Sequence, residues 1–169
     1  MKNTFWSLFL WMLLGCTAQS GNIQQTHSQP AAEESVTLES AEMNEAQITD
    51  VAISGKAGNY TFAVTVASPD SGCEAYANWW EVVSPEGALL YRRILAHSHV
   101  EEQPFTRSGG PIAIAADQPT IVRVHMHPVG YSSLAMKGTP LDGFAFHTLP
   151  EAFGDVLSEA APQPNGCAF

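Results

Sequence analysis

Two pairs of histidines, each with one residue between its members, carry the clearest chemical signal in this sequence. They are His97-Ser-His99 and His125-Met-His127. Residues two apart on a β-strand point to the same face, about 6.5 Å apart, so each pair presents two imidazoles together. Neutral imidazole is a good ligand for zinc and copper. If the strand ends that carry the pairs lie side by side, four imidazoles form a copper or zinc site.

Other side chains could complete that site. Glu101 and Glu102 follow the first pair and offer a carboxylate ligand, or a group that orients an imidazole. His147, in the last expected strand, offers a fifth nitrogen, and Met136, in an expected loop, offers a thioether for Cu(I). Arg107 is expected to pair with Glu101 or Glu102. Two alternatives stay open: the same residues line a polar pocket for a non-metal ligand, or the histidines lie on a solvated face with no site.

Composition excludes some functions. The 169 residues include 17 acidic and 7 basic side chains, for a formal net charge of −10. A chain this acidic cannot replace the counterions along nucleic-acid phosphates, so no nucleic-acid partner is expected. The same charge argues against electrostatic binding to an anionic membrane surface. The length suits one domain of ordinary size.

The amino terminus has the features of a secretory signal. Lys2 precedes an apolar run over residues 5–14. This run is too short to span a bilayer, which needs roughly 20 residues, but it suits the hydrophobic region of a signal peptide over residues 1–15. The ending Leu-Leu-Gly-Cys16 resembles a bacterial lipobox. That resemblance implies that Cys16 becomes acylated, for example with palmitate, and anchors the protein in a lipid bilayer. Thr17, where lipoproteins retained at the inner membrane commonly carry Asp, favours the outer membrane.

Two further regions follow the signal. Residues 16–46 are rich in Gln, Ser, Glu and Ala without a sustained apolar period, which predicts a lipidated, flexible linker. Residues 47–169 form a single expected domain. Its two cysteines, Cys73 and Cys167, are an even pair in an oxidising compartment, so a disulfide is the default expectation. A pair of thiolate ligands or a redox couple is the alternative.

The domain has the pattern of short β-strands. Tyr60, Phe62, Val64 and Val66 alternate with smaller residues at a period of two. Turn residues separate this run from further expected strands. These strands lie at residues 48–53, 79–83, 89–95, around 105, and at 111–115, 119–127 and 143–148. The pattern predicts an all-β fold, an antiparallel immunoglobulin-like β-sandwich of about seven or eight strands behind a disordered N-terminal tether. Residues 151–161 could form one short helical segment.

Part of the domain also carries a resemblance. Residues 55–108 include Trp80-Glu-Val82, His97-x-His99 and the run Glu102-Gln-Pro-Phe-Thr-Arg-Ser108. This stretch resembles a family of small secreted bacterial proteins that are generally uncharacterised. The resemblance implies a shared domain and no particular activity. Family members tend to have Trp where this chain has Cys73, and His where it has Ala75, so any shared site that used that histidine is altered here.

No enzyme signature is present in the sequence. There is no Gly-x-Ser-x-Gly nucleophile motif, no phosphate-binding loop and no His-Glu-x-x-His helix. Two classes of function therefore compete. The first is an envelope lipoprotein that binds copper or zinc through the two histidine pairs. The second is a structural or interaction module of the envelope without a metal, with an exposed aromatic patch near Trp79 or Trp80.

Overall fold

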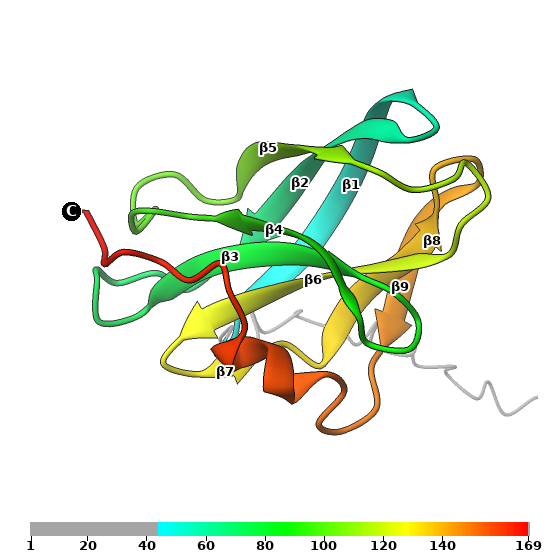
Figure 1. Ribbon diagram of the computed structural model, residues 1–169. Coiled ribbons are helices and arrows are strands. Elements are labelled where there is room, and N and C mark those ends of the chain that lie inside the picture. Colours follow the sequence, from blue (N-terminus) through cyan, green and yellow to red (C-terminus); the bar gives the residue numbers. More distant parts are fainter. Residues whose placement is uncertain (1–43, 169) are drawn as a thin grey trace, which may run out of the picture. The chain divides into compact units, whose positions relative to one another are not determined.

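The computed structural model describes residues 44–168, which contain nine β-strands and one short 3₁₀ helix (Figure 1). The strands are β1 (Gln47–Lys56), β2 (Asn59–Ala67), β3 (Tyr76–Val83), β4 (Leu89–Ile94), β5 (Phe105–Ile112), β6 (Thr120–His127), β7 (Gly130–Tyr131), β8 (Leu134–Thr139) and β9 (Gly143–Thr148). The 3₁₀ helix η1 covers Asp155–Glu159. The expected signal peptide, Cys16 and most of the expected linker lie outside the described residues.

The strands form two antiparallel sheets. One sheet has the order β1-β2-β5, and the other has the order β4-β3-β6-β8-β9 with β7 paired to β6. This arrangement confirms the all-β class and the antiparallel sandwich. Strand β8 was not expected from the sequence, because Met136 and its neighbours lie between Ser and Gly residues that resemble a loop. Met136 was expected in that loop, and its actual place in β8 corrects the expectation.

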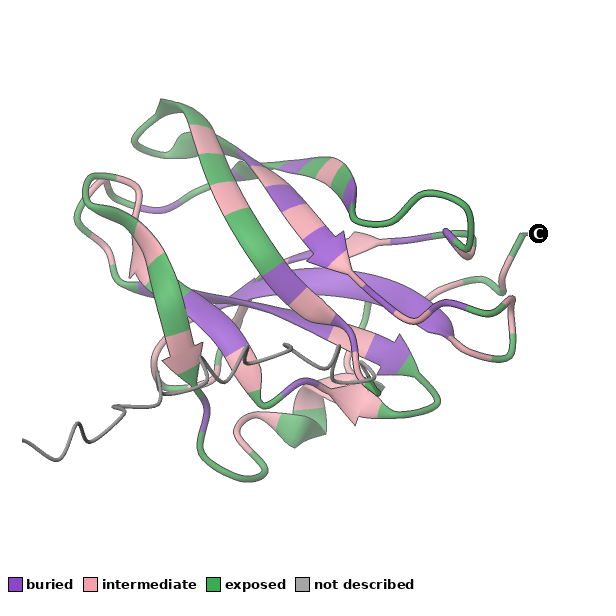
Figure 2. Cartoon of the chain, turned by 180° about the vertical axis from the view of Figure 1, so that it is seen from behind, coloured by how far each residue is buried: buried purple, intermediate pink, exposed green. Residues whose placement is uncertain are grey.

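The core lies between the sheets. In β2 the alternating residues Tyr60, Phe62, Val64 and Val66 are all buried, as the period of two predicts. They pack with residues of β3 and β6, including Trp80, Val82, Val122 and Val124. Burying one such apolar side chain contributes about 1.5–3 kcal/mol. Figure 2 shows buried bands that alternate with exposed or intermediate bands along β2, whereas β1 has mostly exposed and intermediate bands.

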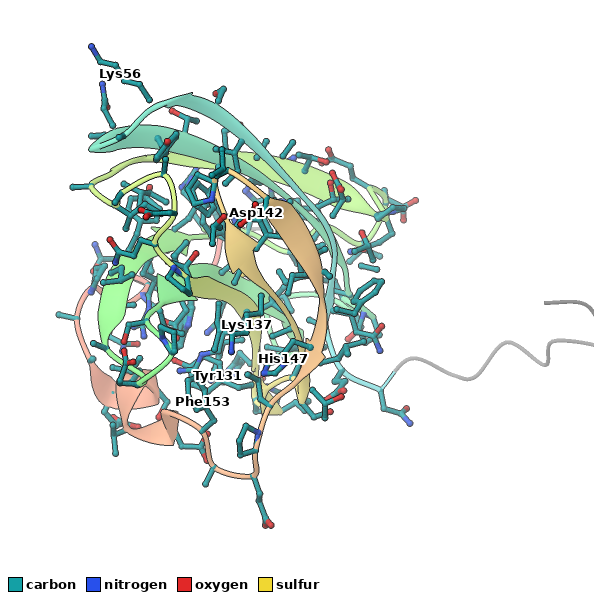
Figure 3. All side chains as sticks on the ribbon, turned by 90° about the vertical axis from the view of Figure 1, so that its right-hand side faces the viewer. Lys56, Tyr131, Lys137, Asp142, His147 and Phe153 are labelled. Atoms are coloured by element: carbon teal, nitrogen blue, oxygen red, sulfur yellow. A yellow bond between two sulfur atoms is a disulfide. The ribbon has the colours of Figure 1, made fainter. Side chains whose placement is uncertain are left out.

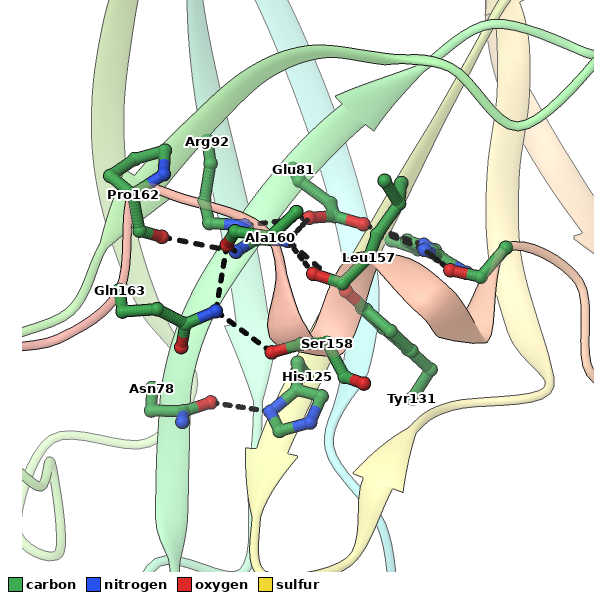
Figure 4. A network of polar contacts seen from close by, with 12 residues as sticks. Asn78, Glu81, Arg92, His125, Tyr131, Leu157, Ser158, Ala160, Pro162 and Gln163 are labelled. Carbon is green, nitrogen blue, oxygen red and sulfur yellow. Dashed lines mark hydrogen bonds and ion pairs between the residues drawn. The ribbon is translucent and has the colours of Figure 1, made fainter.

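Strand β3 differs from the others because every one of its eight residues is buried. One face of β3 meets the core, and the C-terminal segment covers the opposite face. There Glu81 is fully buried and forms ion pairs with Arg92 at 2.7 Å and with Arg123 at 2.8 Å. Figure 4 shows how this cluster meets the segment around η1. Arg92 donates hydrogen bonds to the carbonyl oxygens of Leu157, Ala160 and Pro162.

The two cysteines of the domain are joined, as the sequence predicts. The Cys73–Cys167 disulfide bridges residues 94 positions apart, with a Cα–Cα distance of 5.6 Å. It attaches the end of the C-terminal tail to the loop before β3. Within residues 44–168, no helix has the length and apolar composition needed to cross a membrane.

Candidate functional site

An open pocket of about 440 Å³ lies at the loop between β4 and β5. Its lining residues are His97, Ser98, His99, Val100, Glu101, Glu102 and Ala168. Six of these residues are consecutive in the loop, and the C-terminal tail supplies the seventh. The pocket therefore contains the first histidine pair and both glutamates that the sequence analysis selected.

A buried carboxylate fixes the backbone of this loop. Asp70 accepts hydrogen bonds from the backbone N–H of His99 at 2.8 Å and of Ala77 at 2.9 Å, and from the Ser68 hydroxyl at 2.5 Å. Gln103 donates from Nε2 to the carbonyl oxygen of His99 at 3.1 Å. Hydrogen bonds to an ionised carboxylate are stronger than neutral ones, so Asp70 holds His99 in a defined position. Nothing in the sequence pointed to this role, because Asp70 lies 29 residues before His99 in the chain.

The imidazole of His99 is buried but has no hydrogen-bond partner on either ring nitrogen among the described residues. Only 3% of the residue is exposed, and its ring stacks on Phe105 with centroids 3.7 Å apart. The nearest carboxylate oxygen, on Asp70, lies 3.8 Å from Nδ1, which is beyond hydrogen-bond distance. Burial lowers the pKa of His99, and the charges of Arg107 and His97 lower it further. Burial therefore favours the neutral ring, and no described residue forms a hydrogen bond with either of its nitrogens.

The second imidazole of this pair lies beside the first. The ring centroids of His97 and His99 are 4.4 Å apart, and the planes make an angle of 38°. His97 is exposed and forms an isolated parallel bridge with Ala168. The backbone N–H of Ala168 donates to the carbonyl oxygen of Ala96 at 2.7 Å. Because the adjacent Cys167 is in the disulfide, the tail is held as one wall of the pocket.

Of the two glutamates in the pocket, Glu102 is the one that pairs with Arg107. The guanidinium donates from Nη2 to Oε2 at 2.7 Å and from Nη1 to Oε1 at 3.1 Å. These hydrogen bonds hold the pKa of Glu102 below its usual value and raise that of Arg107. Arg107 also lies 5.4 Å from the centroid of Phe105, the ring on which His99 stacks. The lining of the pocket thus includes the carboxylate of Glu102, paired with Arg107, and that of Glu101, which forms no ion pair with any residue in the described part of the chain.

His125 lies in a different environment, on the face of β3 and β6 that η1 and the tail cover. Its ring stacks on Trp79 with centroids 3.9 Å apart, and Nδ1 is 2.7 Å from Oδ1 of Asn78 (Figure 4). Burial lowers the pKa of His125 to about 4, with further contributions from the charges of Arg92 and Arg123. This imidazole already has a polar partner and an aromatic partner, and it serves packing.

The remaining candidates are dispersed. His127 is exposed at the end of β6, with its ring 6.3 Å from that of Tyr76. His147 lies on β9, at the opposite edge of the sheet from β4 (Figure 3). Met136 packs in the hydrophobic core. Among residues 44–168, no three His, Cys, Asp or Glu side chains are placed to hold a metal ion. The structure therefore brings together His97 and His99, but not all four paired histidines.

The expected aromatic patch is also not formed by the tryptophans. Trp79 is 2% exposed and Trp80 is fully buried. Their side chains point to opposite faces, as expected for neighbours in a strand. However, the guanidinium of Arg92 covers Trp79 at 4.4 Å from the ring centroid. The alternative of an interaction module with an exposed tryptophan therefore loses this support, because the C-terminal segment covers this face of β3.

Comparisons with known proteins add one relative. The chain is 34% identical over 121 residues to a protein of Halomicrobium mukohataei named "Putative lipoprotein". The match covers 71% of this chain and 59% of that relative, so the chain spans less than two thirds of the relative's length. No family model matches the chain, and no solved structure matches it.

Proposed function

We propose that this chain is a lipid-anchored protein of the cell envelope. The support comes from its first residues, where a short apolar run precedes Leu-Leu-Gly-Cys16, and from the relative named as a lipoprotein. Acylation of Cys16 with more than one chain would give stable anchoring, whereas a single chain binds a bilayer only marginally. Thr17 after the cysteine favours the outer membrane.

The function proposed for the β-sandwich is capture of a copper or zinc ion by His97 and His99. The observation that carries this proposal is the buried imidazole of His99, a residue that lines an open pocket and whose two ring nitrogens have no hydrogen-bond partner among residues 44–168. A buried polar group without a partner costs about 1–3 kcal/mol, and a bound ligand would remove that cost. The neighbouring ring of His97 supplies a second nitrogen from 4.4 Å away, measured between centroids.

The surroundings of His99 suit a metal ligand. Metal-binding histidines usually have a carboxylate near the nitrogen that does not bind the metal. The Asp70 carboxylate lies 3.8 Å from Nδ1 without a hydrogen bond, so we assign the other nitrogen, Nε2, to the metal. His125 and His127 are not part of the proposed site, because His125 already engages Asn78 and Trp79. This reduces the four histidines expected from the sequence to two.

Isothermal titration of the full chain in detergent with Cu(II) and with Zn(II), in separate experiments, tests this proposal. We expect about one ion per chain, with the affinity falling at least about tenfold, or 1.4 kcal/mol, in His97→Ala and in His99→Ala. His127→Ala is the matched control, because it removes an exposed imidazole outside the pocket. His97 is exposed, so its variant keeps the test valid if His99→Ala disturbs folding. Absence of uptake, or equal uptake by wild type and both pocket variants, would refute the metal function.

A further inference from the structure

We infer that the Cys73–Cys167 disulfide is a redox switch, which a dithiol opens and which then releases residues 164–168 from the domain. In this step the dithiol is oxidised to a disulfide. Its two electrons and two protons convert the Cys73–Cys167 bond into two free thiols. The end of the tail leaves the loop before β3, and the β-sandwich stays folded. The inference does not depend on metal capture.

The first argument is the accessibility of the disulfide. Both cysteines are half-buried, and Cys167 lines a pocket of about 570 Å³ between the end of β4 and the tail. Reduction begins when a thiolate attacks one sulfur of the disulfide, so the reductant must reach it. Pockets that hold small organic molecules have volumes of about 300–1,000 Å³. A small dithiol or the active-site loop of a reducing protein can therefore approach Cys167, and exposed disulfides belong to the labile class.

The second argument is that Cys73 lies in a turn that does not need the disulfide. The backbone N–H of Ser71 donates to the carbonyl oxygen of Ala75 at 2.9 Å. The backbone N–H of Ala75 donates in turn to the carbonyl oxygen of Gly72 at 3.3 Å. These two hydrogen bonds close the turn around Cys73. This side of the disulfide is therefore expected to keep its position after reduction.

The third argument is that Cys167 lies in a segment with few other attachments. The C-terminal segment is held up to Pro162, because Arg92 donates to the carbonyl oxygens of Ala160 at 2.6 Å and of Pro162 at 3.0 Å (Figure 4). Gln163 donates from its side chain to the carbonyl oxygens of Ser158 and Ala160. These contacts end where residues 164–168 begin.

Beyond that point a single hydrogen bond joins residues 164–168 to the rest of the described chain. It runs from the backbone N–H of Ala168 to the carbonyl oxygen of Ala96, at 2.7 Å. Most of these residues are exposed, so little apolar burial holds them in place. Segments with few buried contacts and exposed hydrogen bonds open at low free-energy cost. The disulfide is thus the main attachment of this segment.

Release of the segment would change the surface beside β4. Residues 165–168 supply half of the residues that line the 570 Å³ pocket, and Ala168 is one wall of the histidine pocket. Once they leave, the carbonyl oxygen of Ala96 loses its partner and the half-buried Ile94 becomes more exposed. The reduced protein would therefore present an open edge that the oxidised protein covers.

The test is hydrogen exchange of the full chain in detergent, followed by mass spectrometry, before and after dithiothreitol is added without denaturant. Alkylation with iodoacetamide should find two more thiols per chain after this treatment. We expect the amide of Ala168 to exchange at least about tenfold faster, and η1 to keep its rates. Oxidised dithiothreitol, which cannot reduce the disulfide, is the reagent control. Cys73→Ser/Cys167→Ser should show the fast exchange without any reductant.

Each outcome decides for or against the switch. A disulfide that resists dithiothreitol until urea is added would overturn it, because the bond would then be inaccessible in the folded protein. Reduction with unchanged exchange at Ala168 would also overturn it, because the segment would then stay in place. Faster exchange in η1 as well would show that the whole C-terminal segment unfolds, which contradicts a local release. None of these results bears on the binding of copper or zinc.

Discussion

Arg107 and Glu102 face each other through two parallel hydrogen bonds, of 2.7 and 3.1 Å, at the edge of the histidine pocket. This ion pair has two consequences for a cation that enters the pocket. The pair engages both carboxylate oxygens of Glu102, so they are not available to a metal ion. It also keeps the positive charge of Arg107 near His99. Both effects oppose metal binding, so Arg107 is expected to weaken the affinity of the site.

Arg107→Gln is therefore predicted to tighten metal binding by roughly tenfold, or 1.4 kcal/mol. The substitution frees Glu102 to act as an oxygen ligand and removes the nearby positive charge. Titration of Cu(II) or Zn(II) into the full chain measures the change. Lys137→Gln removes one exposed positive charge from β8 and is expected to have little effect. Adding Glu102→Gln to Arg107→Gln should reverse most of the gain, and an unchanged affinity in Arg107→Gln would contradict this account.

The buried ion-pair cluster is predicted to be essential for stability. Glu81→Gln leaves the guanidinium groups of Arg92 and Arg123 in a fully buried site without their common counter-ion. Removing one partner of a buried ion pair costs about 3–5 kcal/mol. Urea denaturation should show this loss in the free energy of unfolding. Glu86→Gln, in the exposed turn before β4, is the matched control, and equal stability of the two variants would contradict the assigned role.

His125 is predicted to make the protein less stable in acid. Its pKa in the folded state is about 4, below the ordinary value of 6.5, because burial disfavours the charged ring. Between these two pH values the unfolded chain binds more protons than the folded one. The free energy of unfolding therefore falls as pH falls through this window, by at most about 1.4 kcal/mol per pH unit for one group. His99, whose pKa is also lowered by burial, acts in the same direction.

His125→Phe keeps an aromatic ring against Trp79 and removes the titrating group. Urea denaturation at several pH values between 4 and 7 should show a shallower dependence of stability on pH in this variant. His127→Phe replaces an exposed histidine and should leave the wild-type dependence in place. The same steep dependence in wild type and His125→Phe would assign the acid sensitivity to other groups.

The disulfide is predicted to contribute mainly to the stability of the domain. It closes a loop of more than 90 residues, which corresponds to about 4–5 kcal/mol in the chain-entropy model. The double variant Cys73→Ser/Cys167→Ser should lose about this amount in urea denaturation. It should still fold, because Arg92 independently holds the carbonyl groups of Ala160 and Pro162. A double variant as stable as wild type would show that these hydrogen bonds alone secure the tail.

Much of the fold was predictable because its strands follow simple patterns. The alternation from Tyr60 to Val66 identified both β2 and its buried face. Local sequence did not reveal that residues 150–168 cover the second face of β3. That covering depends on contacts between residues far apart in the chain, such as the hydrogen bond from Arg92 to Leu157. The same contacts explain why Trp79 is buried.

The candidate site was predictable only in part, because it too combines a local pattern with contacts between residues far apart in the chain. The spacing of His97 and His99 indicated that their rings would lie together, and they do. Whether the second pair joins them depends on which face of each strand is covered. Strand register places His125 opposite Trp79 on the covered face, so its ring is used for packing. Asp70 was not identified because its partner, the backbone of His99, lies 29 residues away.

The most direct test of the central claim is a count of the imidazoles that coordinate the bound metal. X-ray absorption spectroscopy of the full chain loaded with one equivalent of Zn(II) provides this count. The account predicts two imidazoles in wild type and in His127→Ala, and fewer than two in His97→Ala. Four imidazoles in wild type, or a count unaffected by His97→Ala, would contradict it.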